Sequence, residues 1–433
     1  MTMSIQDLEA RIEELSSDIE RQREILRKLE HDRSLVQRQL NAARDPVAQL
    51  PLEISSEIFL QCLPPQPIPE ADQAPVLLLN VCTTWSDIAL STPVLWHKLC
   101  IPEELESLNA EAFMAGMERW LHRAGTHLLD ITMERPLDSV VASLIRCYSS
   151  RLQRLDICVC SSGEEFENPN LFDITQLEPR LPFLRTLIFR PTPSDRYQGT
   201  FPAPPIFHLL RGAPELTELS VKALSVLDAA DGIWTAEVVL PNLQRFEYGY
   251  EPPVAEGALK YLTAPRLEFL SLSTAEEPSV VTFLKRSSPP LREVIIDYGP
   301  PVSQTAFTEF LSHLPSVTRL KIGHLSGAAA ESFFDILVET GSGALPSLQT
   351  LELYSMGDWS DWSLVLRALS ARRSGLRSVN LSHFSRHLAV PWSLDAQFRG
   401  EFGQLVADGM EIYIQSEEAA WPDGNIVQLL PAF

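Results

Sequence analysis

Apolar residues recur in a seven-residue pattern over residues 5–40. With Ile5 at position a, the apolar a and d positions are Ile5, Leu8, Ile12, Leu15, Ile19, Leu26, Leu29, Val36 and Leu40. Gln22 and Arg33 interrupt the series. Such a period, held over several heptads, predicts a helix that supercoils with another helix, so residues 1–45 are assigned as a coiled coil. Isoleucine at a with leucine at d favours a parallel homodimer. A coil with another protein, or a helix folded back on its own chain, stays open.

Residues 46–101 carry a second, shorter helical pattern. Its first apolar residues, three to four positions apart, are Ile54, Ile58, Phe59 and Leu63. Pro51 suits the first turn of a helix, and Pro64-Pro65 ends it. A second helix is predicted over residues 76–90. Three short helices cannot bury Trp85 and Trp96 by themselves, so this segment is expected to dock on something larger.

The same segment contains an ordered set of apolar, proline and tryptophan positions. They are Leu50, Pro51, Ile54, Ile58, Phe59, Leu63, Pro64, Val81, Cys82, Trp85, Ile88, Ala89, Pro93 and Trp96. The set resembles the F-box, as in F-box proteins of the fungal type. It departs from the usual F-box pattern in a long acidic linker between the first two helices and in Thr83-Thr84, where a basic pair is common.

An F-box docks on the Skp-type adaptor of a cullin-RING ubiquitin ligase, while the rest of the chain selects a protein substrate. The resemblance therefore implies that this chain binds such an adaptor and, through it, a cullin. The adaptor-binding residues implied are Leu50, Pro51, Ile54, Ile58, Leu63 and the turn at Trp96. Trp85 and Trp96 are themselves expected to be core residues that support the contact.

A longer motif, apolar-x-x-apolar-x-apolar, recurs through the rest of the chain. Its first positions are Leu152, Leu184, Leu216, Leu243, Leu267, Leu291, Val317, Leu348 and Leu376. Successive starts lie between 24 (267−243) and 32 (184−152) residues apart, near the period of leucine-rich repeats. Seven of the nine motifs carry a proline two residues earlier. Residues 305–314 and 332–338 read as outer helices between strands.

The predicted fold class is therefore α/β: parallel strands with outer helices in an irregular solenoid, similar to the leucine-rich repeats that follow F-boxes. Residues 102–127 are assigned as a helical linker or cap, and residues 128–433 as the solenoid with a C-terminal cap. The asparagine ladder of regular leucine-rich repeats is absent.

The third and fifth positions of each motif are expected to face the open side of the sheet, because strand side chains alternate. Phe269 and Ile295 are large apolar residues at such positions on neighbouring repeats, and Arg319 and Lys321 form a basic pair nearby. We hypothesise that these four residues contact an acidic or phosphorylated segment of an unknown protein substrate. The alternative is that a loop, such as residues 250–257, covers them and they are ordinary core.

The amino-acid composition restricts the classes of partner and the cellular location that we expect for this chain. The chain has 57 acidic and 35 basic residues and a net charge of −22, which argues against nucleic acid and anionic membrane as partners. The N-terminus lacks the pattern of a secretory signal, and no apolar run reaches the length of a membrane span. Six cysteines in 433 residues do not suggest a disulfide framework, so a cytoplasmic or nuclear location is expected.

No motif for catalysis, metal binding or a cofactor stands out in the sequence. His383 and His387 lack the glutamate of a zinc protease, and neither a phosphate-binding glycine loop nor a nucleophile elbow is present. We therefore expect a non-catalytic ligase subunit with no cofactor. The alternative from another class is a protein-interaction scaffold that keeps the F-box fold only as a cap.

Overall fold

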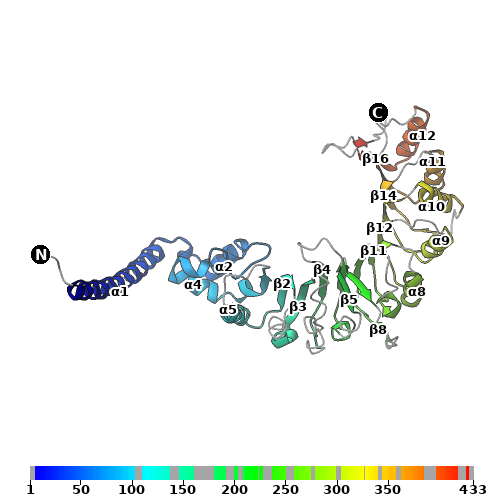
Figure 1. Ribbon diagram of the computed structural model, residues 1–433. Helices are drawn as coiled ribbons and strands as arrows, with labels where there is room; N and C mark the ends of the chain where they lie inside the picture. The colour runs from blue at the N-terminus through cyan, green and yellow to red at the C-terminus, as the bar shows by residue number, and fades with distance from the viewer. Residues whose placement is uncertain are drawn as a thin grey trace. The chain divides into compact units, whose positions relative to one another are not determined.

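The computed structural model describes residues 5–102, 110–136, 146–159, 180–191, 199–202, 207, 209–222, 224–227, 237–249, 258–274, 278–298, 304–325, 327–339, 344–356, 362–384, 396–417 and 426–428. The chain divides into two compact units, Met1–Asp130 and Ile131–Phe433 (Figure 1). Among the described helices, none is both long and apolar enough to cross a lipid bilayer.

The first unit begins with one uninterrupted helix, α1 (Ile5–Arg44), which is 40 residues long (Figure 1). Gln22 and Arg33 do not break it, because glutamine and arginine are good helix formers. The helix ends before Pro46, since a residue that precedes proline is pushed out of the α region. The predicted helix is thus confirmed, while its pairing stays a prediction.

Short elements follow α1 in the first unit. They are η1 (Val47–Gln49), α2 (Leu52–Gln61), α3 (Leu78–Val81), α4 (Thr83–Leu90), η2 (Pro93–Trp96), β1 (Lys98–Ile101) and α5 (Ala110–Arg123). The single helix predicted over residues 76–90 is wrong, because the chain breaks at Cys82. Cys82 is extended (φ −156°, ψ 171°), and its sulfur accepts a hydrogen bond from the backbone N–H of Trp85 at 3.5 Å. The thiol therefore caps α4 and separates it from α3.

Helix α5 helps to bury the tryptophan that three short helices could not bury. Trp96 is fully buried, and its indole N–H donates to the carbonyl of Ala89 at 2.9 Å. The ring of Trp120, from α5, meets Trp96 edge-on at 5.1 Å between centroids. The Arg123 guanidinium lies 4.6 Å from the Trp96 ring centre. Helix α5 therefore packs on the first unit through its buried residues Met117, Trp120 and Leu121.

The second unit is built on one large sheet. Its strands are β2 (Leu129–Pro136), β3 (Leu152–Val159), β4 (Thr186–Pro191), β6 (Glu218–Lys222), β9 (Arg245–Gly249), β11 (Phe269–Thr274), β12 (Glu293–Tyr298), β13 (Arg319–Gly323), β14 (Thr350–Met356), β15 (Ser378–Phe384), β16 (Glu411–Glu417) and β17 (Ile426–Gln428). They neighbour one another in this order. The nine predicted motifs thus form successive strands from β3 to β15, and the described pairs from β3 to β16 are parallel.

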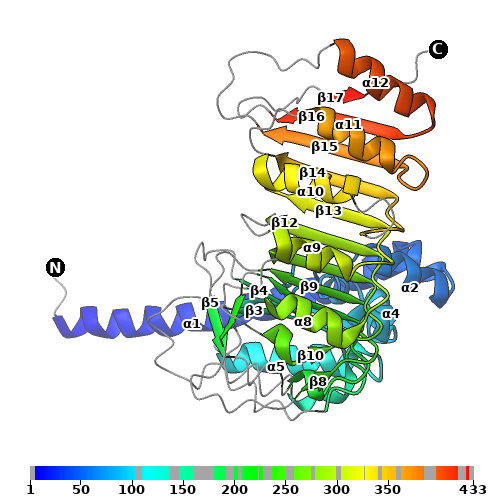
Figure 2. The ribbon, with the colours of Figure 1, turned by 90° about the vertical axis from the view of Figure 1, so that its right-hand side faces the viewer.

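Helices or short strand pairs line the outer side of the repeats. The helices are α8 (Pro278–Ser287), α9 (Gln304–Ser312), α10 (Gly327–Glu339), α11 (Trp362–Ala371) and α12 (Ala396–Ala407), seen in front of the strands in Figure 2. In the earlier repeats, β5 (Gly199–Pro202) pairs with β7 (Leu224–Leu227), and β8 (Val238–Val239) pairs with β10 (Leu262–Thr263). The short helices η3 (Ser149–Arg151) and η6 (Ala258–Tyr261) complete the described elements. The α/β fold with a parallel sheet is confirmed, and it is compatible with a solenoid.

The recurring proline has a specific structural role. In six repeats the first apolar residue of the motif donates its N–H to the carbonyl three residues earlier, as Leu243 does to Leu240 at 3.3 Å. The proline lies at the second position of that four-residue turn, where its fixed φ is favourable. In the repeats from β4 to β15, the residue after the motif start also forms a backbone hydrogen bond to the preceding repeat, as the Gln349 N–H does to the Thr318 carbonyl at 2.8 Å. These bonds tie successive repeats together at the start of their strands.

The core of the second unit lies between the sheet and the outer elements. The motif residues point into it, and Leu219, Leu270 and Leu351 are each at most 1% exposed. At the far edge, β17 pairs with β16 in the antiparallel direction. We expected the C-terminal cap to consist of a weaker tenth repeat over residues 410–414 together with residues 421–433. Residues 411–414 lie in β16, and only residues 426–428 of the second segment lie within the described part of the chain.

Candidate functional site

The clearest candidate for a docking surface is an apolar stripe on and before α2. Ile54 and Ile58 lie one turn apart, so they share a face of the helix. They are 51% and 38% exposed, and Leu50, just before the helix, is 41% exposed. We call Leu50, Ile54 and Ile58 the α2 stripe. The side chains of these three residues therefore keep much of their surface outside the core of the first unit.

A different face of α2 packs inward. Phe59 is fully buried against the ring of Trp85, at 5.0 Å between centroids. Ser55 is also fully buried, and its hydroxyl donates to the carbonyls of Val47 and Pro51 at 3.1 and 3.2 Å. A buried serine with satisfied hydrogen bonds therefore occupies the position that a core-facing isoleucine could have taken. This arrangement fixes the orientation of the helix and holds the α2 stripe outward.

Hydrogen bonds attach α2 and its surroundings to the rest of the first unit. The Ser56 and Thr92 hydroxyls lie 2.9 Å apart. The Trp85 indole N–H donates to the Asp45 carboxylate, which also accepts from the Val47 N–H at 2.9 Å. These contacts join the end of α1, helix α2 and helix α4 in one framework. The stripe thus sits on a rigid support, as a preorganised contact surface requires.

The other predicted adaptor-binding residues differ in exposure. Pro51 is exposed and Leu63 is half-buried. Trp96 is 0% exposed, so the expectation that it is a core residue is confirmed. Contact between the adaptor and the turn at Trp96 stays a prediction. The long linker between the first helices is anchored, since the Cys100 N–H donates to the Pro67 carbonyl at 2.8 Å.

The coiled-coil positions of α1 are exposed wherever their side chains are described. Ile12, Leu15, Ile19, Leu26, Leu29, Val36 and Leu40 are all at least 41% exposed. The side chains of Ile5 and Leu8 lie outside the described part of the chain. Polar positions of α1 form ion pairs along the same helix, such as Arg27 with Glu24 at 2.6 Å and Arg21 with Asp18 at 3.0 Å. The apolar seam is therefore left without a covering element among the described residues.

The hypothesised substrate residues on the sheet need two corrections. Phe269 was expected to be open, but it is only 9% exposed, because the Arg245 guanidinium lies 3.5 Å from its ring centre. Arg319 and Lys321 were expected to meet an acidic or phosphorylated segment of a substrate. Instead the Glu352 carboxylate lies 3.3 Å from Arg319 and 3.9 Å from Lys321.

Ile295 is half-buried between those positions on β12. The four predicted residues do share one face, since register pairs Phe269 with Glu293 and Ile295 with Lys321. They do not, however, offer an open apolar and basic patch to an acidic peptide. Residues 250–257, named as an alternative cover, lie outside the described residues.

Sequence reasoning missed a group of side chains at the ends of β12, β13 and β14. Tyr354 on β14 donates its hydroxyl to Asp297 on β12 at 3.0 Å. Tyr298 and His324 stack on each other at 4.8 Å between ring centroids. We call Asp297, Tyr298, His324 and Tyr354 the strand-end cluster. The sequence does contain a signal for this cluster. In three successive motifs, a tyrosine or histidine follows the last apolar residue by one or two positions.

Among the described residues, no group of three or more His, Cys, Asp or Glu side chains could hold a metal ion. No model of a known protein family matches this chain, and no curated protein matches it.

Proposed function

We propose that this chain is a non-catalytic substrate receptor of a Skp-cullin-F-box ubiquitin ligase. In this proposal the first unit docks on the Skp-type adaptor through the α2 stripe, and the second unit holds a protein substrate on its sheet. The observation that carries the proposal is the outward position of Leu50, Ile54 and Ile58. These are the same residues that the F-box resemblance assigns to adaptor contact.

The physical argument rests on hydration. Three large apolar side chains at 38–51% exposure keep much of their surface in water on a well-anchored helix. Burying such surface in a complex contributes about 25 cal/mol for each Å² removed from water. A rigid element that presents apolar anchors is the usual form of a helical docking site. Within a ligase, the contribution of such a receptor to the reaction is proximity, because it places the substrate near the reacting subunits.

A pull-down with purified Skp-type adaptor tests the docking step. The wild-type chain should bind, and the double variant Leu50→Ala, Ile54→Ala should lose binding by at least about tenfold, since two interface anchors are truncated. The matched control is Phe183→Ala with Val239→Ala, which removes two exposed apolar side chains from the second unit. Circular dichroism should show the same fold for all three proteins.

The outcomes separate the two functions considered. Loss of binding in the α2 double variant alone supports the receptor. Failure of the wild-type chain to bind the adaptor would overturn the ligase function and favour the scaffold.

We also propose that α1 pairs with α1 of a second copy through its exposed seam. Ultracentrifugation of the full chain tests it: the wild type should sediment as a dimer and the variant Ile19→Asp, Leu26→Asp as a monomer, because each change places charges in the seam. The control is Leu35→Asp, at a helix position outside the seam that is also exposed. A monomeric wild type, or a monomeric control, would contradict the pairing.

A further inference from the structure

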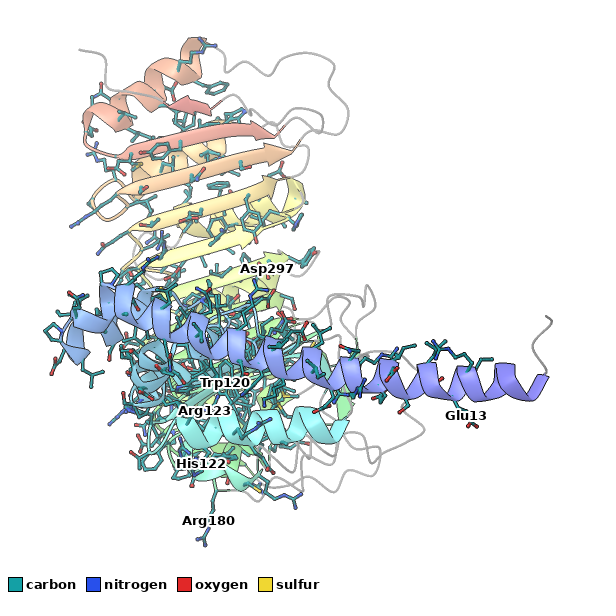
Figure 3. The ribbon with its side chains drawn as sticks, turned by 90° about the vertical axis from the view of Figure 1, so that its left-hand side faces the viewer. Glu13, Trp120, His122, Arg123, Arg180 and Asp297 are labelled. Carbon is teal, nitrogen blue, oxygen red and sulfur yellow. The ribbon has the colours of Figure 1, made fainter. Side chains whose placement is uncertain are left out.

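The strand-end cluster is built from three neighbouring strands around a glycine. Gly323 on β13 pairs in register with Tyr354 on β14. A Cβ at position 323 would lie 2.2 Å from the Cζ atom of Tyr354 and 2.5 Å from the backbone oxygen of Asp297. The absence of a side chain there thus lets the Tyr354 ring cross over β13 and reach the carboxylate of Asp297 on β12. Figure 3 labels Asp297, at the end of its strand.

Two further rings extend this arrangement. His324 follows β13 with a positive φ of 47°, and its N–H donates to the Tyr354 carbonyl at 3.0 Å. Its imidazole stacks on Tyr298 at an interplanar angle of 14° and meets the Tyr354 ring edge-on at 6.0 Å. His324 is exposed and Tyr298 is 39% exposed. Aromatic surface is therefore available to a partner at the ends of β12 and β13.

Tyr298 is also unusual for its unit. Among the described residues of the second unit, the exposed large apolar side chains are Phe183, Val239 and Tyr298. Of these, Tyr298 directly follows Asp297 in β12 and joins the same cluster through His324 and Tyr354. Exposed aromatic residues are enriched at protein–protein interfaces.

The charges around the cluster do not balance. Among the open-face positions of β12, β13 and β14, the acids are Glu293, Asp297 and Glu352, and the bases are Arg319 and Lys321. Glu293 and Glu352 both lie within 4.0 Å of these bases. Asp297 has no ion pair among the described residues, and its described partner is the neutral hydroxyl of Tyr354.

The proton of that hydroxyl stays on Tyr354. Burial, with the hydrogen bond to Asp297 and its negative charge, raises the pKa of Tyr354 above its usual value. The phenol therefore keeps its proton at neutral pH and donates a hydrogen bond to the Asp297 carboxyl group. One hydroxyl satisfies only part of a carboxylate, which can accept about four hydrogen bonds.

We propose that the strand-end cluster binds an arginine or lysine side chain of a protein partner. The cation bonds the Asp297 carboxylate, and its stem and charged head lie against the Tyr298 and His324 rings. A charged hydrogen bond and a cation–π contact reinforce each other in such a site. Arginine fits better than lysine, because a planar guanidinium stacks on rings and donates in a fork. The net charge of −22 attracts a basic segment over longer range.

The neighbouring Lys321 shows that a ring of the cluster accepts a cation. Its ammonium lies 5.0 Å from the Tyr354 ring centre, and its charge is matched by Glu352 at 3.9 Å. The binding position for the partner is therefore on the side of Asp297, Tyr298 and His324. This inference names the chemical class of the segment that the sheet would bind, and it rests on the proposed function in which the second unit holds a protein substrate.

Fluorescence anisotropy with two labelled peptides tests the inference on the full chain without adaptor. Both are glycine-serine peptides with three spaced side chains, arginine in one and neutral citrulline in the other. The wild type should bind the arginine peptide with a Kd below about 1 mM and bind the citrulline peptide at least tenfold more weakly. No adaptor is present in this experiment. A negative peptide result therefore does not argue against adaptor docking by the first unit, and a negative pull-down does not argue against peptide binding by the second unit.

Two variants locate the site. Asp297→Asn should raise the Kd for the arginine peptide at least tenfold, and Tyr298→Ala should raise it severalfold. The matched control is Glu268→Gln, which removes one exposed negative charge elsewhere on the sheet. Glu268 lies just before β11, and its carboxylate is 3.7 Å from Arg292, just before β12. Thermal unfolding should change little for Tyr298→Ala, since the ring is exposed. No binding by the wild type, or equal losses in Asp297→Asn and Glu268→Gln, would overturn the proposal, as would a preference for a phosphorylated peptide.

Discussion

Replacing Gly323 by alanine tests the geometry on which the strand-end cluster depends. The new Cβ would lie 2.2 and 2.4 Å from two atoms of the Tyr354 ring, and 2.5 Å from the Asp297 backbone oxygen. Carbon contacts this short do not persist, so the ring has to leave its place over β13. A backbone oxygen cannot swing aside, so the strands also have to shift.

The cost follows from those two movements. Displacing the ring breaks the Tyr354 to Asp297 hydrogen bond, and a bond to a charged group contributes about 1.5–3 kcal/mol. Forcing a methyl group into a packed position costs about 1–3 kcal/mol. The reduced freedom of the unfolded chain returns about 0.4–1 kcal/mol. We expect Gly323→Ala to lower the free energy of unfolding by about 2–5 kcal/mol.

Urea unfolding, monitored by circular dichroism, measures this loss of stability. A double-mutant cycle with Tyr354 shows how much of the loss depends on the Tyr354 ring. In a Tyr354→Ala background the ring is already gone, so Gly323→Ala should cost at least about 1.5 kcal/mol less than in the wild type. In a Tyr354→Phe background the ring remains, so the steric part of the cost should persist. An equal cost of Gly323→Ala in the wild-type and Tyr354→Ala backgrounds would refute the close crossing of the ring.

Three further results are expected. Trp96→Ala should destabilise the first unit by about 3–5 kcal/mol in thermal or urea unfolding, because the side chain is fully buried, whereas Ile58→Ala should change stability by less than about 0.5 kcal/mol. Leu270→Ala should cost the second unit about 2–5 kcal/mol, since it leaves a cavity at a position that is 0% exposed. In alkaline titration at 295 nm, the difference between wild type and Tyr354→Phe should show a phenol that ionises above the usual value of 10.0. Because the folded pKa is raised, the stability due to Tyr354 should be complete below pH 10.0 and be lost as the pH rises beyond it.

The repeat architecture was predictable because it depends on local periodicity. The nine motifs each contain three apolar residues at fixed spacing, and every motif became a strand with those residues in the core. The turn before six of these strands also follows from sequence, since proline presets its conformation. The break between α3 and α4 was not predictable in this way, because Cys82 acts through a single sulfur contact that no periodic pattern reports.

Contacts between strands set the limits of prediction for the sheet surface. Phe269 stands at a position that alternation places on the open face, but Arg245 from the neighbouring strand covers it. The Tyr354 to Asp297 bond joins residues 57 positions apart. Both contacts depend on register and on the reach of long side chains. Such information becomes available only when neighbouring strands are placed side by side.

The orientation of α2 shows why an apolar stripe alone does not identify a core. Ile54, Ile58 and Phe59 fit one helical face by spacing, and hydrophobicity alone would bury all three. The fold instead buries Ser55 and Phe59, because the serine hydroxyl satisfies two backbone carbonyls and the phenylalanine packs on Trp85. Turning the helix to bury the isoleucines would break those bonds and separate the two rings. The isolated unit therefore keeps apolar surface in water, and a partner that covers Leu50, Ile54 and Ile58 would remove this cost without changing the fold.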